Sequence, residues 1–208
     1  MDTNLDLRDI ERRPAKYWNI DGLPELMMGF LWIVWGGAWL AGQRIPRGSA
    51  WNLYWLFAPA LLVLSGFAAT WATKQLKQRI TFPRTGYVEW SEPSRAQRSG
   101  GVGVAMVTAA MLTTLIVKGR TGAFGDVAAP AMGAMCSVAF LTASFRQRAP
   151  HLLVLAGVSL ALGLAFGAWS TGWDALNWLF VCLGAASVAV GAVRLRGFLK
   201  HNPVEARQ

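Results

Sequence analysis

Few side chains in this sequence have a type and a place suited to acid–base chemistry. The candidates are three carboxylates and one histidine near one rim of the apolar regions: Glu25, Glu89, Glu92 and His151. A general acid and its base must come within hydrogen-bond reach of the reacting group, and no spacing in the chain fixes such a pair. No His-Glu-x-x-His motif, Gly-rich phosphate loop or plausible Ser-His-Asp set accompanies them. Chemistry on lipid headgroups is therefore a minor hypothesis, and no catalytic residue is assigned.

Metal and cofactor chemistry is not indicated by the other polar residues. Cys136 and Cys182 lie inside apolar runs, where a cysteine usually serves as a small packing residue. No cluster with metal-ligand spacing accompanies His151 or His201, the two histidines of the chain. We therefore expect neither a metal site nor a bound cofactor.

The composition indicates a protein embedded in a membrane. Of the 208 residues, 54% are hydrophobic and 15% are charged, whereas a soluble domain carries about 25% charged residues. The charges gather between runs long enough to cross a bilayer as helices. There are six such runs, at 23–41, 51–72, 100–117, 127–145, 152–170 and 175–193. We expect an all-α membrane protein, a single integral domain over residues 1–208 with six transmembrane helices in three hairpins.

The distribution of lysine and arginine predicts the orientation. Four lie in the N-terminal segment 1–22, six in the loop 73–99, two in the loop 146–151 and four in the tail 194–208, which leaves four of the 20 for the opposite side. Basic residues favour the cytoplasmic side, so both termini and the loop 73–99 are expected in the cytoplasm, at the cell inner membrane. The net charge of +9 reflects this rule. No soluble domain is large enough to bind a duplex, and no nucleic-acid partner is expected.

Small residues recur at every fourth position in the later runs. This spacing lets helices approach closely. The rows are Ala129, Gly133 and Ser137; Ser159, Gly163 and Gly167; Gly157, Ala161 and Ala165; and Ser187 with Gly191. We interpret these rows as packing faces rather than as a pore lining. No ionisable residue lies in the middle of any run, which disfavours an ion-coupled transporter.

The first run differs from the others in carrying a stripe of tryptophans. Trp32, Trp35 and Trp39 fall on roughly one face of the expected helix. Such a stripe faces lipid, a neighbouring helix or an apolar ligand, and we assign no cofactor site to it. Asp21 and Pro24 precede and open this run, as is typical of a helix start.

The loop 73–99 contains a polar stretch with a strong local pattern. β-branched and aromatic residues flank Pro83 and Gly86, which suit the corner positions of a turn. The stretch 80–90 is therefore predicted to form a small β-hairpin with Arg84 at its tip, where the guanidinium suits a carboxylate or a phosphate. The candidate contact residues for a partner or a lipid headgroup are Arg79, Pro83, Arg84, Thr85, Gly86 and Tyr87. The six basic residues of this loop would also attract anionic membrane lipids.

Two short motifs flank the first two runs. One is Tyr17-Trp18 with Asp21-Gly22, and the other is Arg79-Ile80-Thr81-Phe82-Pro83-Arg84-Thr85-Gly86-Tyr87-Val88. Together they resemble a group of bacterial multi-pass membrane proteins of uncharacterised function, over roughly the first 90 residues. That group often has tyrosine where this chain has Phe82. The resemblance implies a bacterial inner-membrane setting, and it implies no activity or substrate.

Two functional hypotheses follow from these patterns. The first is a non-enzymatic membrane component that docks a protein partner through the basic loop 74–98, because the helices lack central ionisable groups and the loop looks structured. The alternative is a small permease or lipid-handling protein without ion coupling. Six spans and glycine-rich helices favour that alternative. So do the tryptophans at the expected outer ends of the first and last hairpins, which are Trp39, Trp51, Trp55, Trp169, Trp173 and Trp178.

Overall fold

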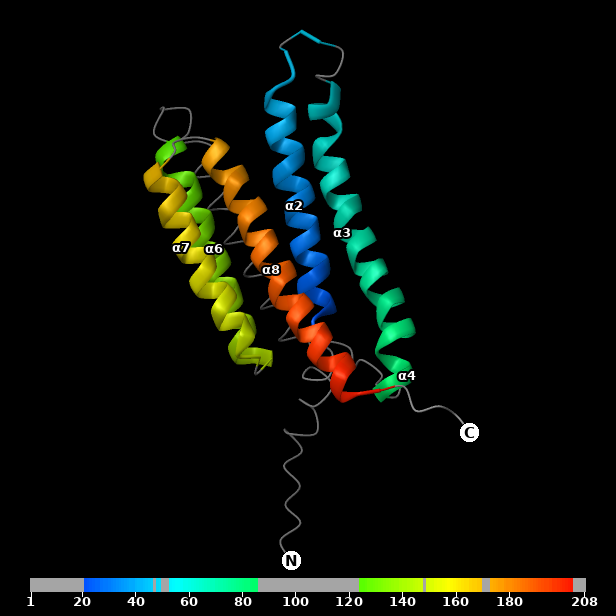
Figure 1. The fold of residues 1–208 in the computed structure, drawn as a ribbon. Coiled ribbons are helices and arrows are strands. Elements are labelled where there is room, and N and C mark those ends of the chain that lie inside the picture. The colour runs from blue at the N-terminus through cyan, green and yellow to red at the C-terminus, as the bar shows by residue number, and fades with distance from the viewer. Residues whose placement is uncertain are drawn as a thin grey trace, which may run out of the picture.

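A computed structural model describes residues 21–46, 48–49, 53–85, 124–147, 149–169 and 173–203. These residues form helices and connecting turns, and no strand occurs among them (Figure 1). In chain order the helices are α2 (Leu23–Gln43), α3 (Leu53–Ile80), α4 (Phe82–Thr85), α6 (Phe124–Gln147), α7 (His151–Trp169) and α8 (Trp173–His201). The described part of the chain therefore has the helical character that the sequence predicts.

The helices pack as two antiparallel pairs, with α3 beside one of them (Figure 1). α2 packs along α8, α6 packs along α7, and α7 contacts α8 to join the pairs. α2 runs antiparallel to α8, because Gly22 lies against Gly191 and Gly36 lies against Asn177. The starts of α2 and α7 and the ends of α3 and α8 thus meet at one end of the bundle, the lower end in Figure 1. We call it the α4 end.

Glycines spaced seven residues apart bring α2 and α8 into backbone contact. Gly22, Gly29 and Gly36 of α2 and its cap all face α8. A Cβ at Gly29 would lie 2.6 Å from the carbonyl oxygen of Gly184, and a Cβ at Gly184 would lie 2.6 Å from the carbonyl oxygen of Gly29. The seven-residue spacing keeps one face of each helix turned toward the other, and the missing side chains allow the close approach.

α6 and α7 are held by a contact of the same kind. A Cβ at Gly163 would lie 2.8 Å from the Cα of Gly133, and one at Gly167 would overlap the ring of Pro130. The predicted packing rows through Gly133, Gly163 and Gly191 are therefore confirmed. The third predicted row is wrong, because its three members are exposed on the outer face of α7: Gly157, Ala161 and Ala165.

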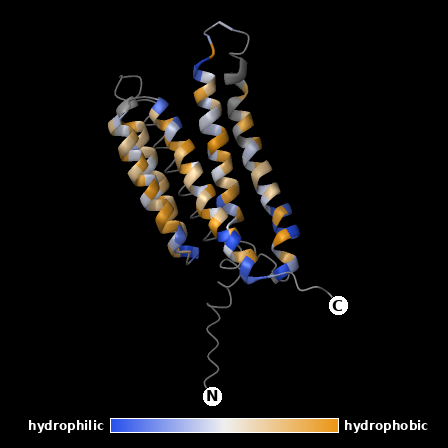
Figure 2. Cartoon of the chain, viewed as in Figure 1, coloured by the Kyte–Doolittle hydropathy of each residue, from blue (hydrophilic) through white to orange (hydrophobic). Residues whose placement is uncertain are grey.

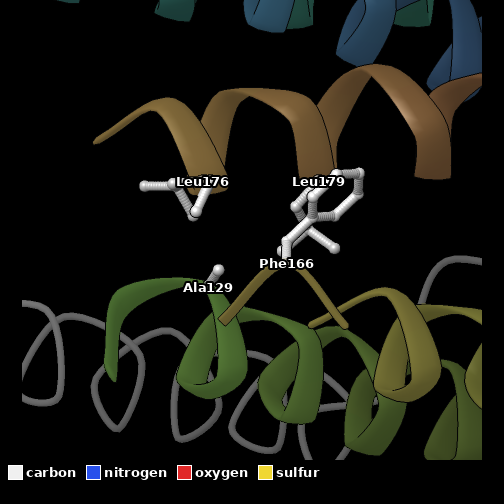
Figure 3. Close-up of a cluster of buried hydrophobic side chains, with 5 residues drawn as sticks. Ala129, Phe166, Leu176 and Leu179 are labelled. Atoms are coloured by element: carbon white, nitrogen blue, oxygen red, sulfur yellow. The ribbon is translucent and has the colours of Figure 1, made fainter. Parts of the chain in front are cut away.

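Larger apolar side chains fill the space between α6, α7 and α8. Figure 3 shows Phe166 of α7 reaching toward Leu176 and Leu179 of α8, above Ala129 of α6. Ala129 and Leu179 are fully buried. These contacts join the two helix pairs through van der Waals packing, because lipid is as apolar as leucine and removal from water does not drive helices together inside a bilayer.

The tryptophan stripe of α2 contacts neighbouring helices, one of the three possibilities left open by the sequence. Trp32 packs edge-on against Phe140 of α6 with centroids 5.9 Å apart and lies 6.4 Å from the ring of Phe180 of α8. Trp35 Nε1 donates a 2.9 Å hydrogen bond to Ser65 Oγ of α3, and Trp39 stacks on Trp173 of α8 at 6.3 Å.

Four of the described helices are long and apolar enough to cross a membrane: Leu23–Gln43, Val127–Gln147, His151–Trp169 and Trp173–His201. Large apolar side chains are exposed on their outer faces, among them Phe30, Phe145, Leu164 and Val193. Hydrophilic residues gather toward the helix ends, above all at the α4 end (Figure 2). Four of the six expected spans are thereby accounted for. The run 51–72 lies largely within α3, and the run 100–117 lies outside the described residues.

The β-hairpin predicted for the stretch 80–90 does not form in its described half. Ile80 is the last residue of α3, and Phe82–Thr85 make the single turn α4. The Thr81 amide donates to the carbonyl oxygen of Lys77 at 2.9 Å, which is the bond that continues a helix. The strand predicted for residues 80–82 is therefore wrong.

Local and distant contacts together explain the helical turn. The Arg84 amide donates to the carbonyl oxygen of Thr81 at 3.1 Å, so the backbone groups are satisfied within the turn. Pro83 fits the first residues of a helix, whose amides have no partner inside it. β-branched and aromatic residues favour strands only where a neighbouring strand packs against them. Residues 86–90 lie outside the described residues.

Candidate functional site

A group of buried polar side chains lies inside the α4 end of the bundle. Four helices supply it, and we call it the polar cluster: Asp21, Glu25, Lys77, Thr81, His151 and Arg194. Ionisable side chains are costly to place among apolar helices, and they mark functional sites more often than chance would allow. The polar cluster is therefore the part of the described structure to test for function.

The start of α2 is shaped to place Asp21 within the bundle. The Oδ1 atom of Asp21 accepts a hydrogen bond from the Leu23 amide at 3.1 Å, which confirms the helix start predicted there. Gly22 has φ 73°, a conformation that disfavours other residues. A Cβ at Gly22 would also lie 2.5 Å from the carbonyl oxygen of Gly191. Two independent reasons thus require glycine at this position, and the turn directs Asp21 toward α3.

Asp21 joins α2 to the end of α3 through two strong hydrogen bonds. Lys77 Nζ donates to Asp21 Oδ2 at 2.6 Å, and Thr81 Oγ1 donates to the same oxygen at 2.7 Å. The side chains of Lys77 and Asp21 are 1% and 0% exposed. Lys77 and Thr81 are four residues apart and so share one face of the helix. The end of α3, where the basic loop begins, is therefore held to α2 by a buried ion pair.

The proton affinity of Lys77 reflects opposing effects. Burial lowers the pKa of the Lys77 ammonium from its ordinary value, because the charged form loses water. The hydrogen bond and charge of Asp21 act in the opposite direction, as does the charge of Glu25. The charge of Glu25 therefore acts on Lys77. This effect connects the Asp21–Lys77 ion pair with the neighbouring group of Glu25, His151 and Arg194.

Glu25, His151 and Arg194 form a hydrogen-bonded chain across three helices. His151 Nε2 lies 2.7 Å from Glu25 Oε1, and Arg194 Nη1 lies 2.7 Å from His151 Nδ1. A guanidinium can only donate, so Nδ1 is the acceptor and carries no proton. The proton of the neutral ring then sits on Nε2, which donates to Glu25. The chain of hydrogen bonds therefore has a defined direction, from Arg194 through the imidazole to the carboxylate.

The charges of the polar cluster balance among the described residues. Asp21 and Glu25 are two carboxylates, and Lys77 and Arg194 are two cations, while His151 is neutral in the arrangement above. The second oxygen of Glu25, Oε2, is buried and has no hydrogen-bond partner among the described residues. Buried charges persist when they are paired and hydrogen-bonded. Asp21 and Lys77 form such a pair, whereas Glu25 and Arg194 are joined through the neutral ring of His151.

The structure brings together two residues of the minor enzyme hypothesis and leaves two outside. Glu25 and His151 meet, although they are 126 positions apart in the chain, whereas Glu89 and Glu92 lie outside the described residues. Both ring nitrogens of His151 are engaged by other side chains. A general base needs a free nitrogen directed at its substrate, so this arrangement does not favour catalysis by His151.

The predicted contact residues at the end of α3 are only partly arranged as expected. Arg79 and Pro83 are exposed. Arg84 is not displayed at a tip, because its Nη1 donates to the carbonyl oxygen of Ile80 at 2.9 Å and its side chain is half-buried. Thr85 closes α4, and the positions Gly86 and Tyr87 lie outside the described residues. Arg84 therefore caps the end of α3 through Nη1.

Sequence reasoning missed most of the polar cluster. In the sequence Lys77 is one of six basic residues of the loop 73–99 and Arg194 is one of four in the tail, and both indicate only the orientation of the chain. One available signal was Asp21 beside Gly22, an acid at a glycine-containing helix start, and another was the four-residue spacing of Lys77 and Thr81. Neither signal gives a partner, because the partners are 56 and 60 residues distant.

Within the described residues, no group of three or more histidine, cysteine or carboxylate side chains could hold a metal ion. Comparisons of the chain with protein families, with curated proteins and with solved structures give no match. The resemblance of residues 79–88 to a bacterial membrane group accordingly stays a prediction.

Proposed function

We propose that this chain is a non-enzymatic, multi-pass protein of a bacterial inner membrane that docks an acidic segment of a protein partner at the cytoplasmic end of α3. The observation that carries the proposal is the pair of hydrogen bonds from Lys77 and Thr81 to Asp21. They hold the first part of the basic segment 74–98 in a fixed position. A surface that is already ordered loses less entropy on binding a partner.

The basic residues of α3 divide into a buried one and exposed ones, which supports this reading. Lys77 is buried in the ion pair with Asp21, whereas Lys74 and Arg79 are exposed. The uncharged Gln78 is exposed between them. Exposed cations on a rigid helix end provide electrostatic complementarity to a carboxylate-rich segment and steer its approach.

Six spans with both termini in the cytoplasm belong to the same proposal. The distribution of basic residues supports the orientation. The positions of Thr85 and of the start of α6 support the number of spans. Thr85 lies at the α4 end, whereas α6 begins at the opposite end, because Pro130 packs on Gly167 near the end of α7. An odd number of crossings between Thr85 and Phe124 is consistent with both positions. Reporter fusions at the two termini test it, and signals from opposite faces would contradict it.

The permease alternative finds less support in the packing. Both antiparallel pairs, α2 with α8 and α6 with α7, are in backbone contact at glycines, so a substrate path within either pair would need to separate them. We therefore favour docking.

A photo-crosslinking experiment in native membranes tests the docking proposal. A photoreactive residue at the exposed Gln78 should form an adduct with one protein, and the crosslinked peptide of that protein should be acidic. The adduct should be lost in the double variant Lys74→Glu and Arg79→Glu. It should persist in a control with the same charge change at the same end of the bundle, Arg196→Glu with Lys200→Glu, whose side chains are exposed on α8.

Three results would contradict the proposal. They are the absence of a protein adduct, an equal loss of the adduct in both double variants, and crosslinks to lipid alone. The last result would show that the basic segment contacts anionic headgroups instead.

A further inference from the structure

His151 connects two helices through opposite sides of one ring. It is the first residue of α7, and its two nitrogens contact Glu25 of α2 and Arg194 of α8, each at 2.7 Å. Its side chain is 12% exposed and that of Glu25 is 6% exposed. The ring therefore serves as an almost buried bridge between the two helix pairs of the bundle.

The bridge depends on the ring being neutral. Arg194 donates to Nδ1, so this nitrogen must keep its lone pair. A proton on Nδ1 would place two donors 2.7 Å apart, and their contact would become repulsive. The opposite contact would gain strength, because a charged imidazolium donating to the Glu25 carboxylate forms a charge-assisted hydrogen bond. Protonation therefore breaks the contact with Arg194 and keeps the contact with Glu25.

The charges around the ring lead to the same conclusion. Among the described residues, the groups that act on it are Glu25 from α2, Arg194 from α8 and, through its interaction with Glu25, Lys77 from α3. In the last turn of α6 the described cation, Arg146, is exposed. Among these described groups two carboxylates balance two cations while the ring is neutral, so a proton taken up by the ring adds a positive charge beside Arg194 in a nearly buried site. Moving Arg194 toward water relieves that excess.

We propose that His151 is a proton-operated latch, in which a proton taken up at Nδ1 displaces Arg194 and frees the end of α8 from α7, while α2 stays bonded to α7 through Glu25. Histidine is the side chain suited to this role, since it changes charge within the physiological range. The glycine contacts of α2 with α8 do not involve the ring, so the bundle remains assembled when the latch opens. The latch does not depend on the docking proposal.

Two measurements on the full-length protein in lipid nanodiscs test the latch. Nitrogen NMR of ¹⁵N-labelled histidine is compared at about pH 8 and at about pH 5.5. The closed latch should show a ring protonated on Nε2 and bare on Nδ1, and the open latch a ring protonated on both nitrogens. Hydrogen exchange, corrected for the intrinsic effect of pH, should show amide protection over residues 192–201 falling about tenfold or more on acidification. That factor corresponds to the loss of one buried charge-assisted hydrogen bond.

Matched variants separate the latch from ordinary acid effects. His151→Gln keeps a donor for Glu25 and an acceptor for Arg194 but takes up no proton, so protection should become independent of pH. His201→Gln should respond as the parent protein does, because His201 is exposed and its ring bonds, among the described residues, to the carbonyl of Gly197 in its own helix.

Charge variants make a second, signed test. Glu25→Gln removes the anion that favours the protonated ring, and should move the midpoint of the pH response to a lower pH. Arg194→Met removes the opposing cation and should move the midpoint of the histidine NMR titration to a higher pH. Equal protection at both pH values, a response retained in His151→Gln, or shifts of the same sign in the two charge variants would each overturn the latch.

Discussion

Replacing Asp21 by alanine is expected to destabilise the protein strongly. The carboxylate accepts hydrogen bonds from the Leu23 amide, Lys77 and Thr81, and its loss leaves the Lys77 ammonium, 1% exposed, without that carboxylate. Removing one partner of a buried ion pair costs about 3–5 kcal/mol. For a chain of this size 1 kcal/mol changes the Tm by about 2–4 °C, so the Tm should fall by roughly 6–20 °C.

The reciprocal and double variants test the cause of that loss. Lys77→Met should cost less, because Asp21 keeps its hydrogen bonds from Thr81 and from Leu23. In the double variant Asp21→Ala with Lys77→Met the buried ammonium is removed together with its carboxylate, and an apolar replacement of a buried pair is often neutral or stabilising. The double variant should therefore be more stable than Asp21→Ala alone, which is the reverse of additive behaviour.

Thermal unfolding in detergent micelles, followed by the fraction that stays soluble and monodisperse, measures these differences. Lys74→Met is the matched control, since Lys74 is exposed on the same helix, and its Tm should stay within about 2 °C of the parent value because surface substitutions usually change stability by less than 0.5 kcal/mol. An Asp21→Ala variant that unfolds at the parent temperature would show that the buried ion pair does not stabilise the protein. The same would follow if the double variant were no more stable than Asp21→Ala, since the ion pair would then not be the source of the stability.

The remaining predictions concern helix packing and use the same unfolding assay. Gly163→Leu should lower the Tm by several degrees, because a Cβ there would lie 2.8 Å from Gly133 Cα and overpacking costs about 1–3 kcal/mol. The control Gly157→Leu on the same helix should leave the Tm unchanged, because the space around Gly157 is open. Gly29→Ala should likewise destabilise, because its Cβ would meet backbone of α8 at 2.6 Å, whereas Gly37→Ala, with nothing within 4 Å, should be neutral or slightly stabilising. If Gly157→Leu lowered the Tm as much as Gly163→Leu, or Gly37→Ala as much as Gly29→Ala, the glycine faces named here would not be the packing faces. Trp35→Phe removes one interhelical hydrogen bond of 2.9 Å and should cost about 0.6–2 kcal/mol, and a Tm equal to that of the parent would show that the bond contributes nothing.

The small-residue rows show how far local patterns carry. The row through Ser159 and Gly163 and the row through Gly157 have the same spacing on the same helix, yet the first is buried against α6 and the second is exposed. Periodicity identifies a face that permits close approach, but it does not say whether another helix occupies that face. The glycines of α2 show the opposite case. Gly22, Gly29 and Gly36 do pack against α8, but they are seven residues apart and so do not form a row of small residues at every fourth position.

The stretch after α3 shows how a distant partner overrides local preference. Ile80, Thr81 and Phe82 have the β-branched and aromatic character of a strand. In the folded chain the Thr81 hydroxyl bonds to Asp21, 60 positions earlier, and the backbone continues as helix. Propensities of this kind amount to about 1 kcal/mol, less than a buried hydrogen bond to a carboxylate contributes.

Sequence alone determined that apolar helices dominate this chain and where four of them lie, because long uncharged runs can satisfy their backbone groups only as helices. It also singled out Glu25 and His151 as residues able to move protons. Only the tertiary structure decided that Asp21 binds Lys77 and that His151 lies between Glu25 and Arg194. Those pairings join residues from 43 to 126 positions apart, and helix ends that distant in sequence meet only when the whole bundle has packed.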